Sequence, residues 1–286
     1  ADVEDAFHYN HTLPLVGDIQ STLARLNDAL ERSASSPNKV KDTWLAECSL
    51  QKRRWHEMKS ERLAHPVLYD EYWQQEVLTQ PAAIMTALDW ARTNRVLSFF
   101  DAGDVQANGF QLVEDDQPGL TFTETGASYM GFAVSALLAT GTATKPFRAI
   151  AFTGDGSFTM NPQILIDGVE HGARGVILLL DNGRMAAISG LQQDQYKAEF
   201  ATANRLQVDY LAWANAVPGI LALDGGSSLS SLKTSLEQAH DHAGLSLIRV
   251  KVYYGSDESG GMGVYGRWNV GNWCEETQRL RHEIGL

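Results

Sequence analysis

The sequence predicts an α/β fold, a doubly wound parallel sheet with an N-terminal helical linker. Apolar strand patterns and helical patterns alternate over most of the chain, which favours a parallel sheet flanked by helices. The clearest such unit is residues 148–182, in which two apolar runs flank a tight turn and a helical stretch. With 286 residues and 44% hydrophobic content, the chain is long enough to bury a large core.

The segments before the sheet are expected to be helical. Asp18 is a candidate N-cap for an amphipathic helix within residues 1–35, and the short stretch 11–18 is a candidate strand. After a polar linker, Val40–His65 is expected to form a long charged helix that packs on a neighbouring surface. The predicted domains are residues 1–35, the tail of a preceding domain, a helical linker at 36–76, a main α/β domain at 77–254 and a C-terminal tail at 255–286.

Strands and helices alternate along the main domain. The expected strands are Val96–Phe100, Ala149–Thr153, Val176–Leu180, Ile220–Leu223 and Leu247–Val252. One helix is expected to begin at Pro81, and the others span Thr125–Thr140, Asn161–His171, Asp209–Ala216 and Ser228–His242. Loops are expected at Asp101–Asp104, on the edge where open α/β sheets bind ligands, and at Gly183–Thr202.

The charge of the chain excludes some classes of partner. Its 23 Lys and Arg residues against 35 Asp and Glu give a formal net charge of −12. Such an acidic chain is a poor candidate for binding nucleic acid or an anionic membrane. No apolar stretch approaches the length of a membrane span, and the N-terminus is acidic rather than signal-like. Cys48 and Cys274 lack metal-site spacing, so we expect free thiols in a reducing cytoplasm.

Asp155 and Asn182 are the candidate metal ligands. Each follows an apolar strand, and the carboxyl ends of neighbouring parallel strands lie at one edge of a sheet. Gly156 lets the backbone approach a ligand, Ser157 adds a hydroxyl, and the next helix begins with N–H groups that favour an anion. These groups suit a magnesium ion that holds a diphosphate. A Gly-Asp-Gly turn without a ligand is the alternative.

The spacing of these residues resembles a known motif. Gly154-Asp155-Gly156, followed by Asn182 at the end of the next strand, is similar to the thiamin-diphosphate motif of the acetolactate synthase and pyruvate oxidase superfamily. Within that superfamily, the stretches KDTWLAE, LTFTETGASYMGF, ISGLQ and RWNVG are similar to the trihydroxycyclohexanedione hydrolases of inositol breakdown. The chain looks like the C-terminal half of such an enzyme, comprising the end of a middle domain, a linker helix and the domain that binds the cofactor's diphosphate.

The resemblance implies thiamin diphosphate and Mg²⁺ as cofactors. It assigns Asp155 and Asn182 to the metal through side-chain oxygens, and Arg184 through its backbone carbonyl. The residues that it assigns to cofactor binding are Ser128, Met130, Gly154, Gly156 and Ser157. Met130 would force the V-shaped conformation of the cofactor, and the carbonyl of Ser128 would accept a hydrogen bond from its 4'-amino group. Filling the core of a small-residue helix is the alternative for Met130.

The resemblance also implies a reaction class. It indicates cleavage or formation of a C–C bond next to a ketone, by a lyase, a carboligase or a C–C hydrolase acting on a 2-oxo acid or a 1,2-diketone. Two departures from the family stand out. The metal loop continues as residues 183–187 rather than as Asn-Asn-x-x-Tyr-Gly, and Asp104-Val105 replaces the Gln-His that many relatives use to bind phosphate.

No stretch in residues 1–100 resembles the pyrimidine-binding domain that carries the activating glutamate in this family. The catalytic glutamate is therefore expected on a separate subunit, in a heteromer such as α2β2, with a fragment of a longer enzyme as the alternative. A non-catalytic scaffold or regulatory homologue is a further alternative. A Rossmann-type nucleotide binder is disfavoured because Thr159 stands where a third glycine is needed.

Four further residues are expected to act structurally or as a cover, and of these Glu124 lies close to the inferred pocket. Glu124 is expected to pair with the backbone or with a lysine, and His171 to end a helix where a cation suits the dipole. Tyr265 and Trp268 are expected either to close over the substrate as a C-terminal lid or to pack against the domain.

Overall fold

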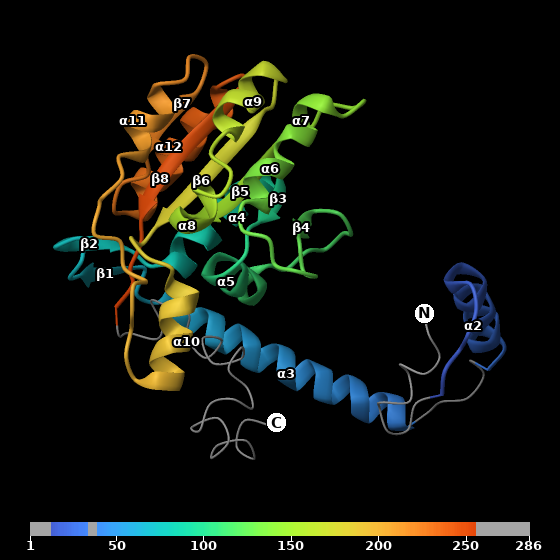
Figure 1. Cartoon of the computed structure of the whole chain (residues 1–286). Helices are drawn as coiled ribbons and strands as arrows, with labels where there is room; N and C mark the ends of the chain where they lie inside the picture. Colours follow the sequence, from blue (N-terminus) through green and yellow to red (C-terminus); the bar gives the residue numbers. More distant parts are fainter. Residues whose placement is uncertain (1–12, 34–38, 256–286) are drawn as a thin grey trace. The chain divides into compact units, whose positions relative to one another are not determined.

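The computed structural model describes residues 13–33 and 39–255, which divide between Trp55 and His56 into two compact units (Figure 1). Cys48 is free and exposed, as predicted. Tyr265, Trp268 and Cys274 lie outside the described residues, as does the predicted tail apart from Gly255. No helix in the described part of the chain is both long enough and apolar enough to cross a membrane.

In the first unit, α2 (Ile19–Ser33) is the predicted N-terminal helix. Asp18 caps it, because its Oδ1 accepts a hydrogen bond from the Ser21 N–H at 2.9 Å. Residues 13–18 form no strand, so the predicted strand is wrong over its described part. Pro14 lacks a backbone donor, and a lone strand without a neighbour is not stable. The predicted long charged helix is confirmed as α3 (Lys39–Leu63), which continues from this unit into the second.

The second unit contains the predicted parallel sheet. Its strands lie in the order β4 (Thr121–Thr123), β3 (Leu97–Phe100), β5 (Ala149–Gly154), β6 (Gly175–Asp181), β8 (Leu245–Lys251) and β7 (Leu221–Asp224). Every neighbouring pair is parallel. All of β6 and nearly all of β5 are buried, as expected for apolar strands covered on both faces. The predicted α/β fold class is confirmed.

Helices lie on both faces of this sheet (Figure 1). On one face, α4 (Gln80–Asn94), α5 (Asp104–Leu112) and α12 (Leu229–Asp241) pack against a core that includes Phe100 and Phe152. The other core is formed with α6 (Phe132–Ala136), α9 (Ile164–Glu170) and α11 (Tyr210–Asn215). Alternate residues of one strand enter opposite cores, Leu178 the first and Leu179 the second, because side chains alternate across a strand.

Several predicted elements differ from the structure. The predicted helix Thr125–Thr140 is wrong over residues 125–131, which are irregular, and only α6 and α7 (Leu138–Thr142) follow. The predicted loop Gly183–Thr202 contains α10 (Ala186–Tyr196). Its Gly190 weakens the local helical signal.

Further elements were not predicted from the sequence. The hairpin of β1 (Val67–Asp70) and β2 (Gln75–Leu78) precedes α4, and β4 and α5 occupy a stretch that shows only weak periodicity. The predicted helix from Asn161 begins only at Ile164, after the short helix α8 (Asp155–Phe158). Pro162 lacks the backbone N–H that a continuous helix would use at this position.

The C-terminal part of α3 is joined to the main domain by buried polar contacts. Arg62 is 5% exposed and donates to Asn108 Oδ1 at 2.8 Å and to the Gln111 side chain, both on α5. Asn108 in turn donates to the side chain of Gln80, the first residue of α4. Burial lowers the pKa of Arg62 to about 10, which still leaves the guanidinium charged at neutral pH.

Candidate cofactor site

The residues singled out in the sequence lie together at the carboxyl ends of β5 and β6. A cavity of about 510 Å³ opens at this edge of the sheet. The residues predicted to bind cofactor or metal all line it: Ser128, Met130, Gly154, Asp155, Gly156, Ser157, Asn182 and Arg184. The cause is the parallel register of the two strands, which sets Gly154 beside Leu180 and so places the residues after each strand next to one another.

Asp155 is a buried carboxylate at the start of α8. It is 2% exposed, and its Oδ2 accepts a hydrogen bond from Asn204 Nδ2 at 3.1 Å. Burial raises the pKa of Asp155, and with the smaller effect of the nearby Asp181 carboxylate it reaches about 7. Asp181 is itself paired with Arg249, whose Nε lies 2.9 Å from its Oδ2. A bound cation would favour the charged form of Asp155.

Asn182 and Arg184 occupy the turn after β6. The Oδ1 of Asn182 accepts the Arg184 N–H at 3.1 Å. The guanidinium of Arg184 lies 4.2 Å from the centre of the Tyr254 ring and within 3.2 Å of Glu199 Oε2. A guanidinium is a cation and no metal ligand, so the metal contact that the resemblance implies for Arg184 would use its backbone carbonyl. Gly183 has a φ of +68°, and a side chain there would overlap the Tyr72 ring, so the turn requires glycine.

The donors at this edge suit magnesium bound together with an anion. Across the described ranges, no cluster of three or more His, Cys, Asp or Glu residues is arranged to hold a metal. One carboxylate, one amide oxygen and one backbone carbonyl leave part of an octahedron to phosphate and water, which is how Mg²⁺ is commonly held. At Gly156 a Cβ would lie 2.5 Å from Met185 Sδ, so only glycine leaves the backbone here open to a ligand.

The loop of residues 125–131 carries Ser128 and Met130. The carboxylate of Glu124 accepts hydrogen bonds from the backbone N–H groups of Gly126, Ala127 and Tyr129 at 2.7 to 3.1 Å. These bonds lower the pKa of Glu124, and the bond from Ala127 has the largest effect. The predicted pairing of Glu124 with the backbone is confirmed. These bonds take the place of helical ones, and Ser128 has a φ of +54°, which a helix does not allow.

Asp101 anchors the far end of this loop and was not assigned a role from the sequence. Its Oδ1 accepts the Gly131 N–H at 2.8 Å, and its Oδ2 accepts the Thr153 hydroxyl at 2.8 Å. The side chain is fully buried, and burial raises the pKa of Asp101 despite these bonds. Its position directly after β3, on the ligand-binding edge, was the only sequence signal.

Other residues that line the cavity also escaped the sequence analysis. They come from the start of α4, from α5 and from α10, and include Gln80, Phe110, Met185, Ala187 and Ile188. Gln106 lines the cavity too, and its amide donates to Thr123 Oγ1 at 2.6 Å, which ties α5 to β4. The sequence pattern does not identify the residues at α10, because this segment was expected to be a loop. His171 ends α9, as predicted.

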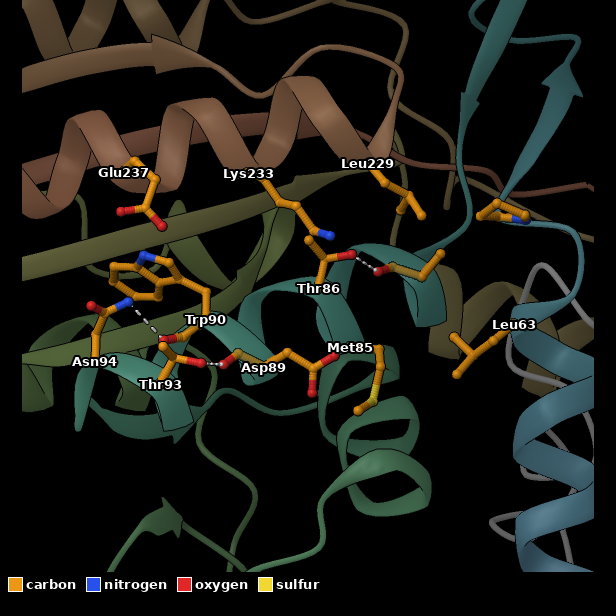
Figure 2. Close-up of a pocket in the computed structure, with 12 residues that line it drawn as sticks. Leu63, Met85, Thr86, Asp89, Trp90, Thr93, Asn94, Leu229, Lys233 and Glu237 are labelled. Carbon is orange, nitrogen blue, oxygen red and sulfur yellow. Dashed lines mark hydrogen bonds between the residues drawn. The ribbon is translucent and has the colours of Figure 1, made fainter.

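A second cavity, of about 430 Å³, lies between α4 and α12 (Figure 2). Three of its polar side chains bond to the backbone of α4 itself, namely Thr86, Thr93 and Asn94, at 2.8 to 3.0 Å. Its charged residues are of both signs, with Lys233 and Glu237 on α12 and Asp89 on α4 (Figure 2). No residue predicted to bind cofactor or metal lines it.

Two curated relatives show what the chain is similar to. It is 28% identical over 260 residues to the 3D-(3,5/4)-trihydroxycyclohexane-1,2-dione hydrolase of Bacillus subtilis (strain 168), which covers 83% of this chain and 40% of that protein. It is 27% identical over 260 residues to the Bacillus licheniformis protein of the same name, with the same coverage. The chain therefore spans about two fifths of the length of these relatives.

Solved structures support the fold. A thiamine diphosphate-dependent 4-hydroxybenzoylformate decarboxylase from Rhodococcus jostii RHA1 matches with a TM-score of 0.56 and 15% identity, over 63% of this chain and 34% of that one. A benzoylformate decarboxylase from Polynucleobacter necessarius matches with a TM-score of 0.54 and 18% identity, over 61% and 33%. At such identity, the likeness supports the fold alone.

The sequence also matches a family, over residues 101–250. That family is described as thiamine pyrophosphate enzyme, C-terminal TPP binding domain. The match starts at Asp101, directly after β3, and ends within β8, so it covers every lining residue of the cavity except Gln80. The expected resemblance is confirmed, and the chain belongs to the thiamine pyrophosphate enzymes, of which it carries the C-terminal cofactor-binding domain.

Proposed function

We propose that this chain is the cofactor-binding subunit of a split thiamin-diphosphate enzyme that cleaves or forms a C–C bond next to a ketone. The observation that carries the proposal is the single cavity lined by Ser128, Met130, Gly154, Asp155, Gly156, Ser157, Asn182 and Arg184. When bound, thiamin diphosphate supplies a nucleophilic carbon for attack on a carbonyl. The chain's own residues bind that cofactor and fix its shape.

In this proposal Asp155 and Asn182 bind Mg²⁺ through their side chains, and Arg184 through its backbone carbonyl. Gly154, Gly156 and Ser157 hold the diphosphate. The burial of Asp155 supports its role, because a buried carboxylate with a raised pKa gains most from a bound cation.

Ser128 and Met130 orient the organic part of the cofactor. Met130 would support its bent conformation, and the Ser128 carbonyl would accept a hydrogen bond from its 4'-amino group. The hydrogen bonds from this loop to Glu124 and Asp101 support these roles, because they hold it in one conformation before the cofactor binds.

The activating glutamate is proposed to come from a separate subunit, in an α2β2 heteromer. No glutamate is among the described residues that line the cavity. The division of the chain at 1–35, 36–76, 77–254 and 255–286, and its place in the cytoplasm, stay predictions.

Hydrolysis of a cyclic 1,2-diketone is the reaction we favour. The support is that the matched relatives carry the name of a hydrolase of a trihydroxycyclohexane-1,2-dione. Decarboxylation of a 2-oxo acid and acyloin-type ligation use the same nucleophile and are the other members of this proposal. A non-catalytic scaffold or regulatory homologue is the second candidate, and the complete set of metal and diphosphate donors disfavours it.

Calorimetric titration of thiamin diphosphate with Mg²⁺ tests the proposal. The chain is measured alone and with the protein encoded beside it, as wild type and as Asp155→Ala. Asp89→Ala is the matched control, because it removes a carboxylate from the second cavity. Binding that is lost in Asp155→Ala and kept in Asp89→Ala supports the metal site, and turnover of a cyclic diketone only with the partner supports the split enzyme. Equal binding by all three proteins would contradict the assignment of Asp155.

A further inference from the structure

Asp104 stands out among the residues of the cofactor cavity. It is the first residue of α5, directly after Gly103, whose φ of +84° turns the chain from β3 into that helix. The side chain lines the cavity together with Asp155 and Ser157, yet it is only 9% exposed. None of the roles proposed above uses it.

One oxygen of the Asp104 carboxyl group lacks the partner that a buried charge needs. Its Oδ1 is buried without a hydrogen-bond partner among the described residues. Burial, which is the cause of the shift, raises the pKa of Asp104 to about 7. Below about pH 7 the group is therefore mainly a neutral acid, which can donate one hydrogen bond.

The charged groups around Asp104 are engaged elsewhere or share its sign. Asp155 and Arg184 line the same cavity, and the other titratable groups on the elements that form it or adjoin them are Arg62 on α3, Glu114 after α5, Asp101 after β3 and Tyr254 after β8. Arg62 donates to Asn108 and Gln111, and Arg184 to Glu199. From α4, the cavity is lined by Gln80, which is neutral. Burial raises the pKa of Tyr254, and the charges of Glu199 and Asp104 add to this shift, so Asp104 and Tyr254 interact.

We propose that Asp104 keeps its proton in the cofactor complex and donates it in a hydrogen bond to an anionic oxygen of the diphosphate. This inference rests on the proposed function, because it needs a diphosphate in this cavity. An ionised carboxylate at the same place would repel the anion, whereas an O–H donor to a charged oxygen makes a strong hydrogen bond. Cofactor affinity then falls once the pH rises far enough to remove the proton.

The test is calorimetric titration of thiamin diphosphate at saturating Mg²⁺, with the partner protein present wherever binding requires it. Wild type, Asp104→Asn and Asp104→Ala are compared at about pH 6 and about pH 8.5. Asn keeps the shape and an N–H donor without ionising, and Ala removes the donor. Because the phosphate of the cofactor and Asp155 titrate in every protein, the ratio of affinities between wild type and Asp104→Asn isolates Asp104.

At about pH 6, wild type and Asp104→Asn are expected to bind thiamin diphosphate with similar affinity. At about pH 8.5, wild type is expected to bind it about 10- to 30-fold more weakly than Asp104→Asn. Asp104→Ala is expected to bind more weakly than Asp104→Asn at both. Titrations in buffers of different ionisation enthalpy should show that wild type takes up nearly one proton more than Asp104→Asn on binding at the higher pH.

The outcomes separate this inference from the proposed function. A ratio of wild type to Asp104→Asn that does not change with pH overturns the inference, while the binding itself upholds the cofactor site. Absence of binding in all three proteins at both pH values overturns both. Equal affinity of Asp104→Ala and Asp104→Asn at both pH values also overturns the inference, because it shows that no donor is needed.

Discussion

Removing the charge of Asp104 should stabilise the protein when no cofactor is bound. Burial raises the pKa of Asp104 to about 7 from an ordinary value of 3.8. The folded state therefore keeps a proton that the unfolded state has lost between these two values, and stability falls as the pH rises through this window. About three pKa units correspond to a cost on the order of 4 kcal/mol, fully present above about pH 7.

Asp104→Asn does not ionise and avoids this cost. The free energy of unfolding of Asp104→Asn minus that of wild type should increase by on the order of 3 kcal/mol from about pH 5 to about pH 8. This is the part of the total cost that develops between those two pH values. Urea unfolding of both proteins at the two pH values, without cofactor, measures this gain. Asp89→Asn is the control, because its carboxylate is largely exposed.

A stability difference between wild type and Asp104→Asn that stays constant from low to high pH would refute this reasoning. It would mean that Asp104 ionises at its ordinary pKa, so that water or a cation reaches it in the folded protein. A pH-dependent gain of similar size in Asp89→Asn would show that the measured effect is not specific to burial.

Three further predictions concern the groups that shape the cavity. Asp101→Ala removes the acceptor of the Gly131 N–H and of the Thr153 hydroxyl. The free energy of unfolding should therefore fall by about 2 to 3 kcal/mol in urea titrations, and cofactor affinity should weaken. Unchanged affinity would show that the loop holds its position without Asp101. Gly156→Ala places a methyl group against the flexible Met185 side chain, so stability should change little while calorimetry shows cofactor binding weakened about tenfold or more. Gly190→Ala, on α10 with open space around its Cα, is its control and should leave affinity unchanged. Arg62→Ala leaves Asn108 Oδ1 in the interior without its donor and should lower the free energy of unfolding by about 3 kcal/mol. Arg62→Lys should restore only part of this loss, because lysine lacks the guanidinium fork. A loss below about 1 kcal/mol in Arg62→Ala would count against a structural role for this contact.

The sequence alone determined the central part of the fold. The apolar runs of β5 and β6 are buried nearly throughout, and such runs in alternation with helices predict a parallel sheet. Once these two strands are parallel neighbours, Asp155 and Asn182 must lie at one edge of the sheet. Asp18 and Ser228 were also identifiable as starts of helices, because capping depends on residues within one turn.

Only the tertiary structure decided the conformation of the loop that carries Met130. Its sequence is rich in small residues and is typical of a helix, but the loop is held by Glu124 and, across 30 positions, by the hydrogen bond of Asp101 to the Gly131 N–H. The burial of Asp104 likewise depends on packing between elements far apart in the chain. Local patterns determine the strands, helices and caps, because these depend on near neighbours. The shape and charge of the cavity depend on contacts between distant segments, which exist only in the folded chain.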